Sequence, residues 1–353
     1  MKKQNRFRER HGSIGEMETG PLNSITDVEG VTVGHVTLSD GDCQTGVTAV
    51  LPHQGNLFKE KLIATSHVLN GFGKTMGTIQ LQELGVIETP ILLTNTLNVG
   101  TAADACIEHM LARNPEIGRT TGTVNAVIGE CNDMLLNDIR KQHVHKTHIH
   151  QAIQHASKQV EEGSVGAGRG MLCYSLKGGI GTSSRLIPLS HGVYTMGILV
   201  MSNFGILRDL TIKGRSIGQE LKKKLLDEWQ EKDKGSIMII AATDLPVTDR
   251  QLNRILKRTV TGLSRTGSII THGSGEIVIG FSTATRIPHE KTNQPIEVSM
   301  IHEEEMDEAF RAIGEATEEA VLNSLTTAVA VKGRDGNERP AFTDLLDRFN
   351  LSL

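Results

Sequence analysis

The chain is predicted to fold as a layered α/β sandwich built as a single domain, residues 1–353. Short apolar runs interrupted by glycines alternate with a few strongly helical segments, which is typical of strands packed in layers against helices. No Pro/Ser-rich linker divides the sequence, and no fixed-period repeat occurs in it. With 38% hydrophobic residues the chain can bury a large core, although length by itself leaves two smaller domains open.

The predicted strands are short runs rich in aliphatic and β-branched residues, bounded by turn residues. They cover residues 25–36, 46–52, 89–96, 196–204 and 236–243. Two further strand-like runs, 267–271 and 276–281, flank the tetrapeptide His272-Gly273-Ser274-Gly275. The sequence therefore predicts that this tetrapeptide forms a tight junction between two β segments.

Two segments are predicted to form helices. The first, 101–113, follows the strand at 89–96, and the second, 303–327, carries a periodic set of apolar residues. The apolar positions near one face of the second helix are Met306, Phe310, Ile313, Ala320 and Leu325. The polar segment after Arg334 is predicted to be a loosely held tail.

Composition argues against several classes of function. The net charge of −4, from 37 basic and 41 acidic residues, provides no field suited to a nucleic acid or an anionic membrane. Aromatic residues make up only 3%, so platforms for base stacking are not expected. No apolar run approaches the ~20 residues of a membrane span, and the basic residues 1–10 precede no signal-peptide segment. We expect a cytoplasmic protein without nucleic-acid or membrane partners.

The cysteines and histidines do not predict a metal site. Four cysteines, Cys43, Cys106, Cys131 and Cys173, lie far apart without a CxxC pair, so we expect small buried residues in a reducing compartment. Five histidines crowd into residues 141–156, but no carboxylate or cysteine completes a recognisable ligand spacing. The glycine-rich run 163–170 lacks the Lys-Ser/Thr of a phosphate-binding loop and is predicted to be a crowded turn near the active site.

Ser274 is the candidate nucleophile, and Gly273-Ser274 is the candidate self-cleavage bond. Flanking glycines remove Cβ crowding and permit the strained backbone that attack of a hydroxyl on the preceding carbonyl needs. Cleavage would leave Ser274 as a new N-terminus, whose α-amine has a reference pKa of roughly 7.7–8 and could accept the hydroxyl proton. A plain turn is the alternative for Gly-Ser-Gly taken alone.

Ordered blocks through the chain resemble the self-processing serine aminopeptidases that include L-aminopeptidase/D-alanyl esterase-amidases and β-peptidyl aminopeptidases. The resemblance spans roughly residues 20–330. The matching blocks are residues 25–36, 88–96, 129–133, 162–168, 177–185, 202–205, 242–244, 273–283 and 315–320.

This resemblance implies a four-layer αββα sandwich, shared with ornithine acetyltransferase-like proteins, and autocleavage into chains 1–273 and 274–353. It implies release of N-terminal residues, in some members D- or β-amino acids, from small peptides, amides or esters through an acyl-enzyme. It also implies a homo-oligomer, commonly a tetramer, that needs no cofactor.

The resemblance also assigns roles to particular side chains. Asn203 corresponds to the amide that stabilises the oxyanion, and Glu130 to the glutamate that holds the substrate ammonium, with Asp133 as a second candidate. Asn132 stands where some members carry a tyrosine, which predicts a more open or differently polar substrate pocket.

His302 and Glu304 align with the serine and glutamate that support the nucleophile in β-peptide-cleaving members. The imidazole of His302 could itself act as a base near neutral pH. Glu303, Glu304 and Glu305 could instead simply place negative charge at a helix N-terminus.

Two alternatives to hydrolysis remain open. An acyltransferase would use the same ester intermediate, although those enzymes use a threonine where this chain has Ser274. The second alternative is a binding protein that keeps the sandwich without processing or catalysis, because Asn132 and His302 depart from the family pattern.

Overall fold

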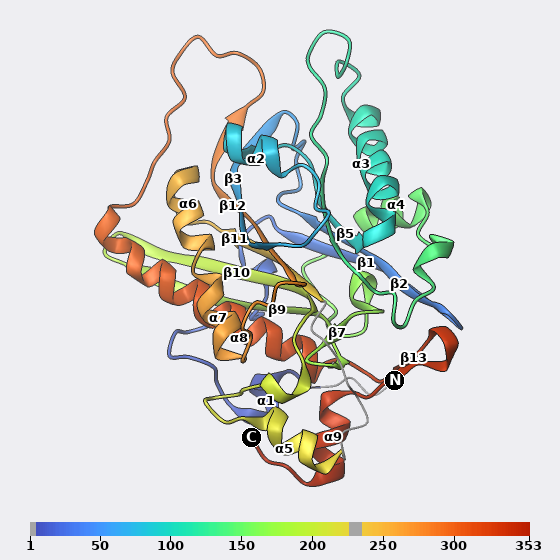
Figure 1. The fold of residues 1–353 in the computed structure, drawn as a ribbon. Helices are drawn as coiled ribbons and strands as arrows, with labels where there is room; N and C mark the ends of the chain where they lie inside the picture. The colour runs from blue at the N-terminus through green and yellow to red at the C-terminus, as the bar shows by residue number, and fades with distance from the viewer. Residues whose placement is uncertain (1–4, 226–234) are drawn as a thin grey trace.

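Two β-sheets lie face to face, and helices cover both outer faces, in the computed structural model of the chain (Figure 1). The structure describes residues 5–225 and 235–353. The four layers run helix, sheet, sheet, helix, so the predicted αββα sandwich is confirmed.

The first sheet has four strands in the order β1-β2-β5-β6. Its strands are β1 (Thr32–Asp40), β2 (Cys43–Leu51), β5 (Ile91–Asn95) and β6 (Val127–Cys131). The β1–β2 and β2–β5 pairs are antiparallel, whereas β5 and β6 run parallel. The parallel pair requires a crossover, which α3 (Val99–Arg113) supplies.

The second sheet has six strands in the order β4-β3-β12-β11-β10-β9. Its strands are β3 (Glu60–Gly71), β4 (Val86–Ile87), β9 (Gly179–Leu189), β10 (Gly192–Asn203), β11 (Ser236–Thr243) and β12 (Gly275–Pro288). A hairpin joins β9 and β10, while β11 and β12 are parallel and are connected through α6 (Asp249–Leu256) and α7 (Thr259–Arg265). In this strand order, β11 and β12 lie inside the sheet, between β10 and β3.

Side chains of the six-stranded sheet alternate between two apolar cores, as the two-residue repeat of a strand requires. Leu199 and Met201 of β10 point toward the other sheet, whereas Ile198 and Val200 point toward the long helix α8 (Met306–Thr326). A third core lies between the four-stranded sheet, α3 and α4 (Lys146–Gln154). The three cores fill the three spaces between the four layers.

The remaining α-helices and strands are short. They are the helices α1 (Phe7–His11), α2 (Thr78–Leu84), α5 (Ile217–Lys224) and α9 (Phe342–Phe349), and the two-residue strands β7 (Leu172–Cys173), β8 (Leu176–Lys177), β13 (Val331–Lys332) and β14 (Glu338–Arg339). None of the helices within residues 5–225 and 235–353 combines the length and hydrophobicity that crossing a bilayer requires.

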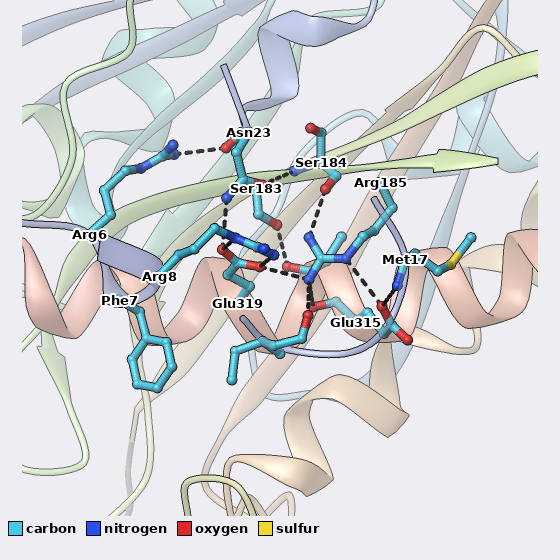
Figure 2. A network of polar contacts seen from close by, with 12 residues as sticks. Arg6, Phe7, Arg8, Met17, Asn23, Ser183, Ser184, Arg185, Glu315 and Glu319 are labelled. Atoms are coloured by element: carbon cyan, nitrogen blue, oxygen red, sulfur yellow. Dashed lines mark hydrogen bonds and ion pairs between the residues drawn. The ribbon is translucent and has the colours of Figure 1, made fainter. Parts of the chain in front are cut away.

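A buried ionic network joins the N-terminal segment, β9 and α8 (Figure 2). The Arg185 guanidinium is fully buried and donates to Glu319 Oε2 at 2.7 Å and to Glu315 Oε2 at 3.3 Å. It also donates to the backbone oxygens of Ile14 and Ser184, at 2.8 and 2.7 Å. Arg8 adds two hydrogen bonds to Glu319, at 3.0 and 2.8 Å. Each buried charge is thus paired, which burial of ionic groups demands.

Three local predictions are wrong. The strand predicted at 25–36 begins only at Thr32, because residues Ile25–Asp27 form a 3-10 helix. Residues 267–271 form a loop rather than a strand, because Gly267 and Ile270 have φ of +99° and +52°, which extended backbone does not allow. The tail after Arg334 is not loosely held. It contains α9, whose Phe342, Leu345 and Leu346 are buried in the core beside α8.

Arg185→Met should destabilise the protein by about 3–5 kcal/mol, because it leaves the buried carboxylates of Glu315 and Glu319 without their shared partner. Arg10→Met is the matched control, since Arg10 pairs with Asp347 at the surface, where ion pairs contribute about 0–1 kcal/mol. Urea unfolding of the two variants measures the difference. Equal midpoints for both would contradict the assigned role of Arg185.

Candidate active site

The predicted functional residues Ser274, Asn203, Glu130, Asn132 and Asp133 gather where several strands begin or end. Strand β10 ends at Asn203, β11 begins at Ser236, and β12 begins at Gly275. Ser236 is the register partner of Asn203 on one side and of Gly275 on the other. The end of β6 lies over this edge, because the Cys131 thiol donates to the backbone oxygen of Met201 at 3.6 Å.

The Asn203 side chain is fixed at both ends of its amide. Its Oδ1 accepts from Leu172 N at 2.8 Å, and its Nδ2 donates to the backbone oxygen of Asn132 at 3.0 Å. An amide nitrogen carries two N–H donors, so the other remains for a reacting oxygen. Asn203 is therefore a preorganised donor in a nearly buried position.

The loop that fixes Asn203 depends on a buried lysine. Lys177 Nζ donates to the backbone oxygens of Gly168, Met171 and Gly178 at 2.9, 2.7 and 2.7 Å. Burial lowers the pKa of Lys177 well below its ordinary value, although the three carbonyl acceptors suit a charged ammonium. Its bonds hold the turn just before Leu172, where the glycine-rich run forms the crowded turn expected near the site.

Ser236 shares a face of the sheet with Asn203. Directly opposed residues of an antiparallel pair project to the same side, and Met201 and Met238, two residues from Asn203 and Ser236, both point between the sheets. The Ser236 hydroxyl lies near the Cys131 thiol of the four-stranded sheet and acts to lower the pKa of that thiol, against the larger effect of burial. It is thus a hydroxyl directed into the space that holds the Asn203 amide.

The peptide bond before Ser236 requires glycine. A Cβ on Gly235 would lie 1.8 Å from the backbone oxygen of Asn203, a distance that no side chain can adopt. The Gly235 carbonyl accepts from Gly275 N at 3.2 Å. Ser236 is not among the predicted site residues, although Gly235-Ser236 followed by an apolar strand is the signal in the sequence that identifies it.

Ser274 lies on the other side of the sheet from Ser236. Its side chain is fully buried, and its Oγ donates to Glu276 Oε1. Ser274 N donates to the backbone oxygen of Thr271 at 3.0 Å, and its carbonyl accepts from the Asn70 amide. Glu276 precedes Ile277, which points between the sheets, so Glu276 points toward the α8 side. Ser274 and Glu276 therefore form a buried hydroxyl–carboxylate pair beside the Gly235-Ser236 bond.

Glu130 offers a fixed carboxylate near the same edge. Its Oε1 accepts from Lys74 N at 2.8 Å, and its Oε2 accepts from the Thr96 hydroxyl. Gly73, next to Lys74, packs directly against Ile277 of β12. The carboxylate is only 4% exposed, so a bound cation would meet it in a partly dry environment.

Asn132 and Asp133 point in different directions. Asn132 is exposed, and its Oδ1 accepts from Met134 N at 3.0 Å. Asp133 is 1% exposed, and its Oδ1 accepts from Asn137 Nδ2 at 3.0 Å. Asp133 stays a second, more deeply buried candidate for the substrate ammonium.

His302 and Glu304 are not brought to this edge, so their expected support of the nucleophile is wrong. Their side chains are 72% and 91% exposed, in the turn Glu303–Glu305 and the residue before it. The neighbouring Glu305 binds His191 at the start of β10, whereas Ser324, near the other end of α8, contacts Ser202. The 21 residues of α8 separate these ends by roughly 30 Å. The His302 side chain instead accepts from Glu304 N at 3.3 Å as a helix cap.

No cluster of histidine, cysteine or carboxylate side chains within residues 5–225 and 235–353 has an arrangement suited to a metal ion. The rings of His145 and His148 contact each other at a tilt, with their centroids 5.5 Å apart, and His150 lies 3.6 Å from Glu108 on α3. These contacts account for the histidine-rich segment as the edge of a surface helix.

Comparison with known proteins decides the family. The family model for peptidase family S58 matches residues 23–339. The chain belongs to peptidase family S58. It is 36% identical over 339 residues to β-peptidyl aminopeptidase BapA of Sphingosinicella microcystinivorans, an alignment that covers 90% of this chain and 84% of the relative.

Two solved structures agree with this S58 assignment. A crystal structure of a protein from Pyrococcus horikoshii OT3 is 46% identical, with a TM-score of 0.92, and the match covers 99% of this chain and all of that one. The L-aminopeptidase D-Ala-esterase/amidase from Ochrobactrum anthropi, described as a variant of the Ntn hydrolase fold, is 31% identical with a TM-score of 0.86. That match covers 96% of this chain and 97% of the neighbour. The resemblance predicted from sequence is therefore confirmed, and the protein is a peptidase.

Asp133 makes stability depend on pH. Burial raises the pKa of its carboxyl to about 7, against hydrogen bonds from Thr45 and Asn137 that act to lower it. An unfolded aspartate ionises near pH 4, so the folded state is favoured below that pH and loses stability as the pH rises toward 7. Asp133→Asn removes this loss.

We therefore expect the urea midpoint of Asp133→Asn to rise relative to that of the wild type between about pH 4 and pH 7. Asp40→Asn, at an exposed position in β1, serves as the reference substitution. A difference between Asp133→Asn and wild type that stays constant over this range would contradict a raised pKa.

Proposed function

We propose that this S58 peptidase is a self-processing serine aminopeptidase that releases N-terminal residues from small peptides, amides or esters through an acyl-enzyme. One observation carries the proposal: Ser236 and Asn203 are cross-strand partners on one face of the sheet, so a nucleophilic hydroxyl and an oxyanion donor lie side by side. The names of the two aminopeptidases similar to this chain support the same activity.

The geometry favours Gly235-Ser236 over Gly273-Ser274 as the bond that is cleaved. Ser236 faces the Asn203 amide and is 6% exposed, whereas Ser274 is fully buried on the opposite side with its hydroxyl bound to Glu276. The Gly235 carbonyl also accepts a backbone N–H from Gly275, which polarises it toward attack. We therefore assign the nucleophile to Ser236 and a supporting role to the Ser274–Glu276 pair.

Self-cleavage would proceed through an ester. The Ser236 oxygen attacks the Gly235 carbonyl, the C–N bond breaks, and the Ser236 nitrogen leaves as an amine that takes up the hydroxyl proton. Water then hydrolyses the ester, which releases the Gly235 carboxylate and restores the hydroxyl. The result is a chain that begins at Ser236 with a free α-amine.

The same hydroxyl would then attack the substrate. The α-amine, with a reference pKa of roughly 7.7–8, accepts its proton and passes it to the leaving amine. Asn203 donates to the oxyanion that forms, and loss of one such donor typically costs about 3–4 kcal/mol of transition-state stabilisation. Water finally hydrolyses the acyl-enzyme and regenerates Ser236.

The carboxylate of Glu130 explains why the enzyme would act at the N-terminus of a substrate. A substrate ammonium paired with this fixed carboxylate places the first residue, rather than an internal one, at the nucleophile. Asn132 is exposed beside the site and would contact the residue that is released. The substrate class is therefore small molecules with a free amine next to an amide or ester.

N-terminal sequencing of the small fragment identifies the bond that is cut. We expect Ser-Ile-Met-Ile from cleavage before Ser236, whereas cleavage before Ser274 would give Ser-Gly-Glu-Ile. Ser236→Ala should remain one chain without activity. Ser274→Ala should be cut more slowly but at the same bond, since only a supporting hydroxyl is lost. An active wild-type protein that stays intact would contradict self-processing altogether.

Glu130→Gln should raise KM for an aminoacyl p-nitroanilide by tenfold or more and change kcat less, because a neutral amide loses the charge-assisted pairing with the ammonium. N-acetylation of the substrate should weaken binding to the wild type by a similar factor and have little further effect on the variant. A variant that still discriminates fully against the acetylated substrate would place the ammonium site elsewhere.

Acyl transfer is the second candidate, since an acyl-enzyme can also react with an amine. Product analysis with and without an added amine distinguishes it from hydrolysis. Homo-oligomeric assembly, as a tetramer, stays a prediction that light scattering can test.

A further inference from the structure

We propose that the buried ammonium of Lys177 strengthens the oxyanion donor by polarising, through one peptide group, the side-chain amide of Asn203. The inference rests on the proposed function, in which Asn203 donates to the oxyanion, and adds a second residue to that task. Lys177 is a positioning residue, because it acts through Asn203 and does not touch the substrate.

A single peptide group joins Lys177 to Asn203. The Met171 carbonyl accepts from Lys177 Nζ at 2.7 Å and from Gly178 N at 3.1 Å. The N–H on the other side of the same peptide bond belongs to Leu172, and it donates to Asn203 Oδ1 at 2.8 Å. The Nδ2 of that amide carries the N–H that is left for the oxyanion. A continuous chain of hydrogen bonds therefore runs from the ammonium to the amide that would meet the oxyanion.

The contacts of Lys177 require its charged form. Its side chain is fully buried, and its Nζ donates to the backbone oxygens of Gly168, Met171 and Gly178 at 2.9, 2.7 and 2.7 Å. Burial and the charge of Arg169 lower the pKa of Lys177 well below its ordinary value. The three donor bonds outweigh this effect, because a neutral amine has only two N–H groups and would face the third oxygen with its lone pair.

Hydrogen bonds in such a chain strengthen one another. A cation on a carbonyl oxygen draws electrons through the peptide bond, so the N–H on its other side becomes a stronger donor. The Asn203 amide is polarised in the same sense when its Oδ1 accepts that N–H, and its remaining N–H becomes more positive. Because the full charge of the oxyanion develops only as the reaction proceeds, a stronger donor raises kcat more than it tightens substrate binding.

Lys177→Met tests the proposal, because methionine is an uncharged chain of similar shape. We expect kcat on an aminoacyl p-nitroanilide to fall by about three- to tenfold, since only part of the effect of the Asn203 donor is lost. KM should change by less than about twofold, and self-cleavage should slow by the same factor as kcat. An unchanged kcat would overturn the proposal.

Gln251→Met is the matched control. The Gln251 side chain is also fully buried, and its Nε2 donates to the backbone oxygen of Ile301, beside the end of α8 that lies away from the site. The substitution removes this donor, so the control should lose stability but keep the wild-type kcat. An equal fall of kcat in both variants would show a general effect of destabilisation and would count against Lys177.

The peptide group between Met171 and Leu172 can be observed by NMR, which separates polarisation from simple support of the turn. Met-Leu occurs three times in the sequence, at residues 110–111, 134–135 and 171–172. With carbonyl-13C methionine and 15N leucine, an HNCO spectrum therefore contains three signals, of which 110–111 in α3 is the reference. In Lys177→Met, the carbonyl carbon and amide proton of 171–172 should both move upfield while the Leu172 N–H stays protected from solvent exchange. Loss of that protection would mean that Lys177 only holds the turn.

The wild-type protein provides a measurement that does not depend on the folding of a variant. With 15N in the lysine side chains, Lys177 should give an ammonium signal with three slowly exchanging protons. A neutral amine at this position would refute the proposal. The proposed function fails on a different result, wild-type kcat in Asn203→Ala or retained activity in Ser236→Ala, so the two failures are distinguishable.

Discussion

The register of β10, β11 and β12 is the constraint on which the site depends. Because Ser236 is aligned with Asn203 on one side and with Gly275 on the other, three chain segments far apart in sequence present their functional groups at one sheet edge. A slip of one residue would reverse the face of every side chain in β11 and remove the Ser236 hydroxyl from Asn203. The two apolar cores oppose such a slip, since each would then receive the other's residues.

The long helix α8 contributes to the same alignment through its C-terminal end and its buried acids. Ser324 contacts Ser202 beside Asn203, and Glu315 and Glu319 bind Arg185 in β9. In Glu319, burial would raise the pKa, but the hydrogen bond from Arg8 and the charge of Arg185 outweigh it and lower the pKa below its ordinary value. These paired charges fix where α8 lies along its axis relative to β9 and β10. Apolar contacts alone would define that position less sharply.

Much of the architecture was predictable because it depends on local pattern. The run 236–243 coincides with β11, and the periodic apolar residues of 303–327 indicated α8. The site was only partly predictable. The roles proposed for Asn203 and Glu130 come from matched motifs. The choice between the two Gly-Ser bonds depends on which face of the sheet each serine occupies, and strand pairing alone determines that. The prediction that His302 and Glu304 support the nucleophile was wrong because a motif alignment across a long loop contains no information about which end of α8 reaches the site.

The interior position of β11 and β12 has a consequence for the cleavage that we propose before Ser236. Both strands are flanked by strands that precede either Gly-Ser bond, β10 on one side and β3 on the other. A cut before Ser236 would leave two polypeptides that share a single continuous sheet. Neither could depart without breaking the backbone hydrogen bonds along both flanks, so the products of self-cleavage would stay interlocked as one folding unit, and subunit exchange between enzyme molecules would require global unfolding.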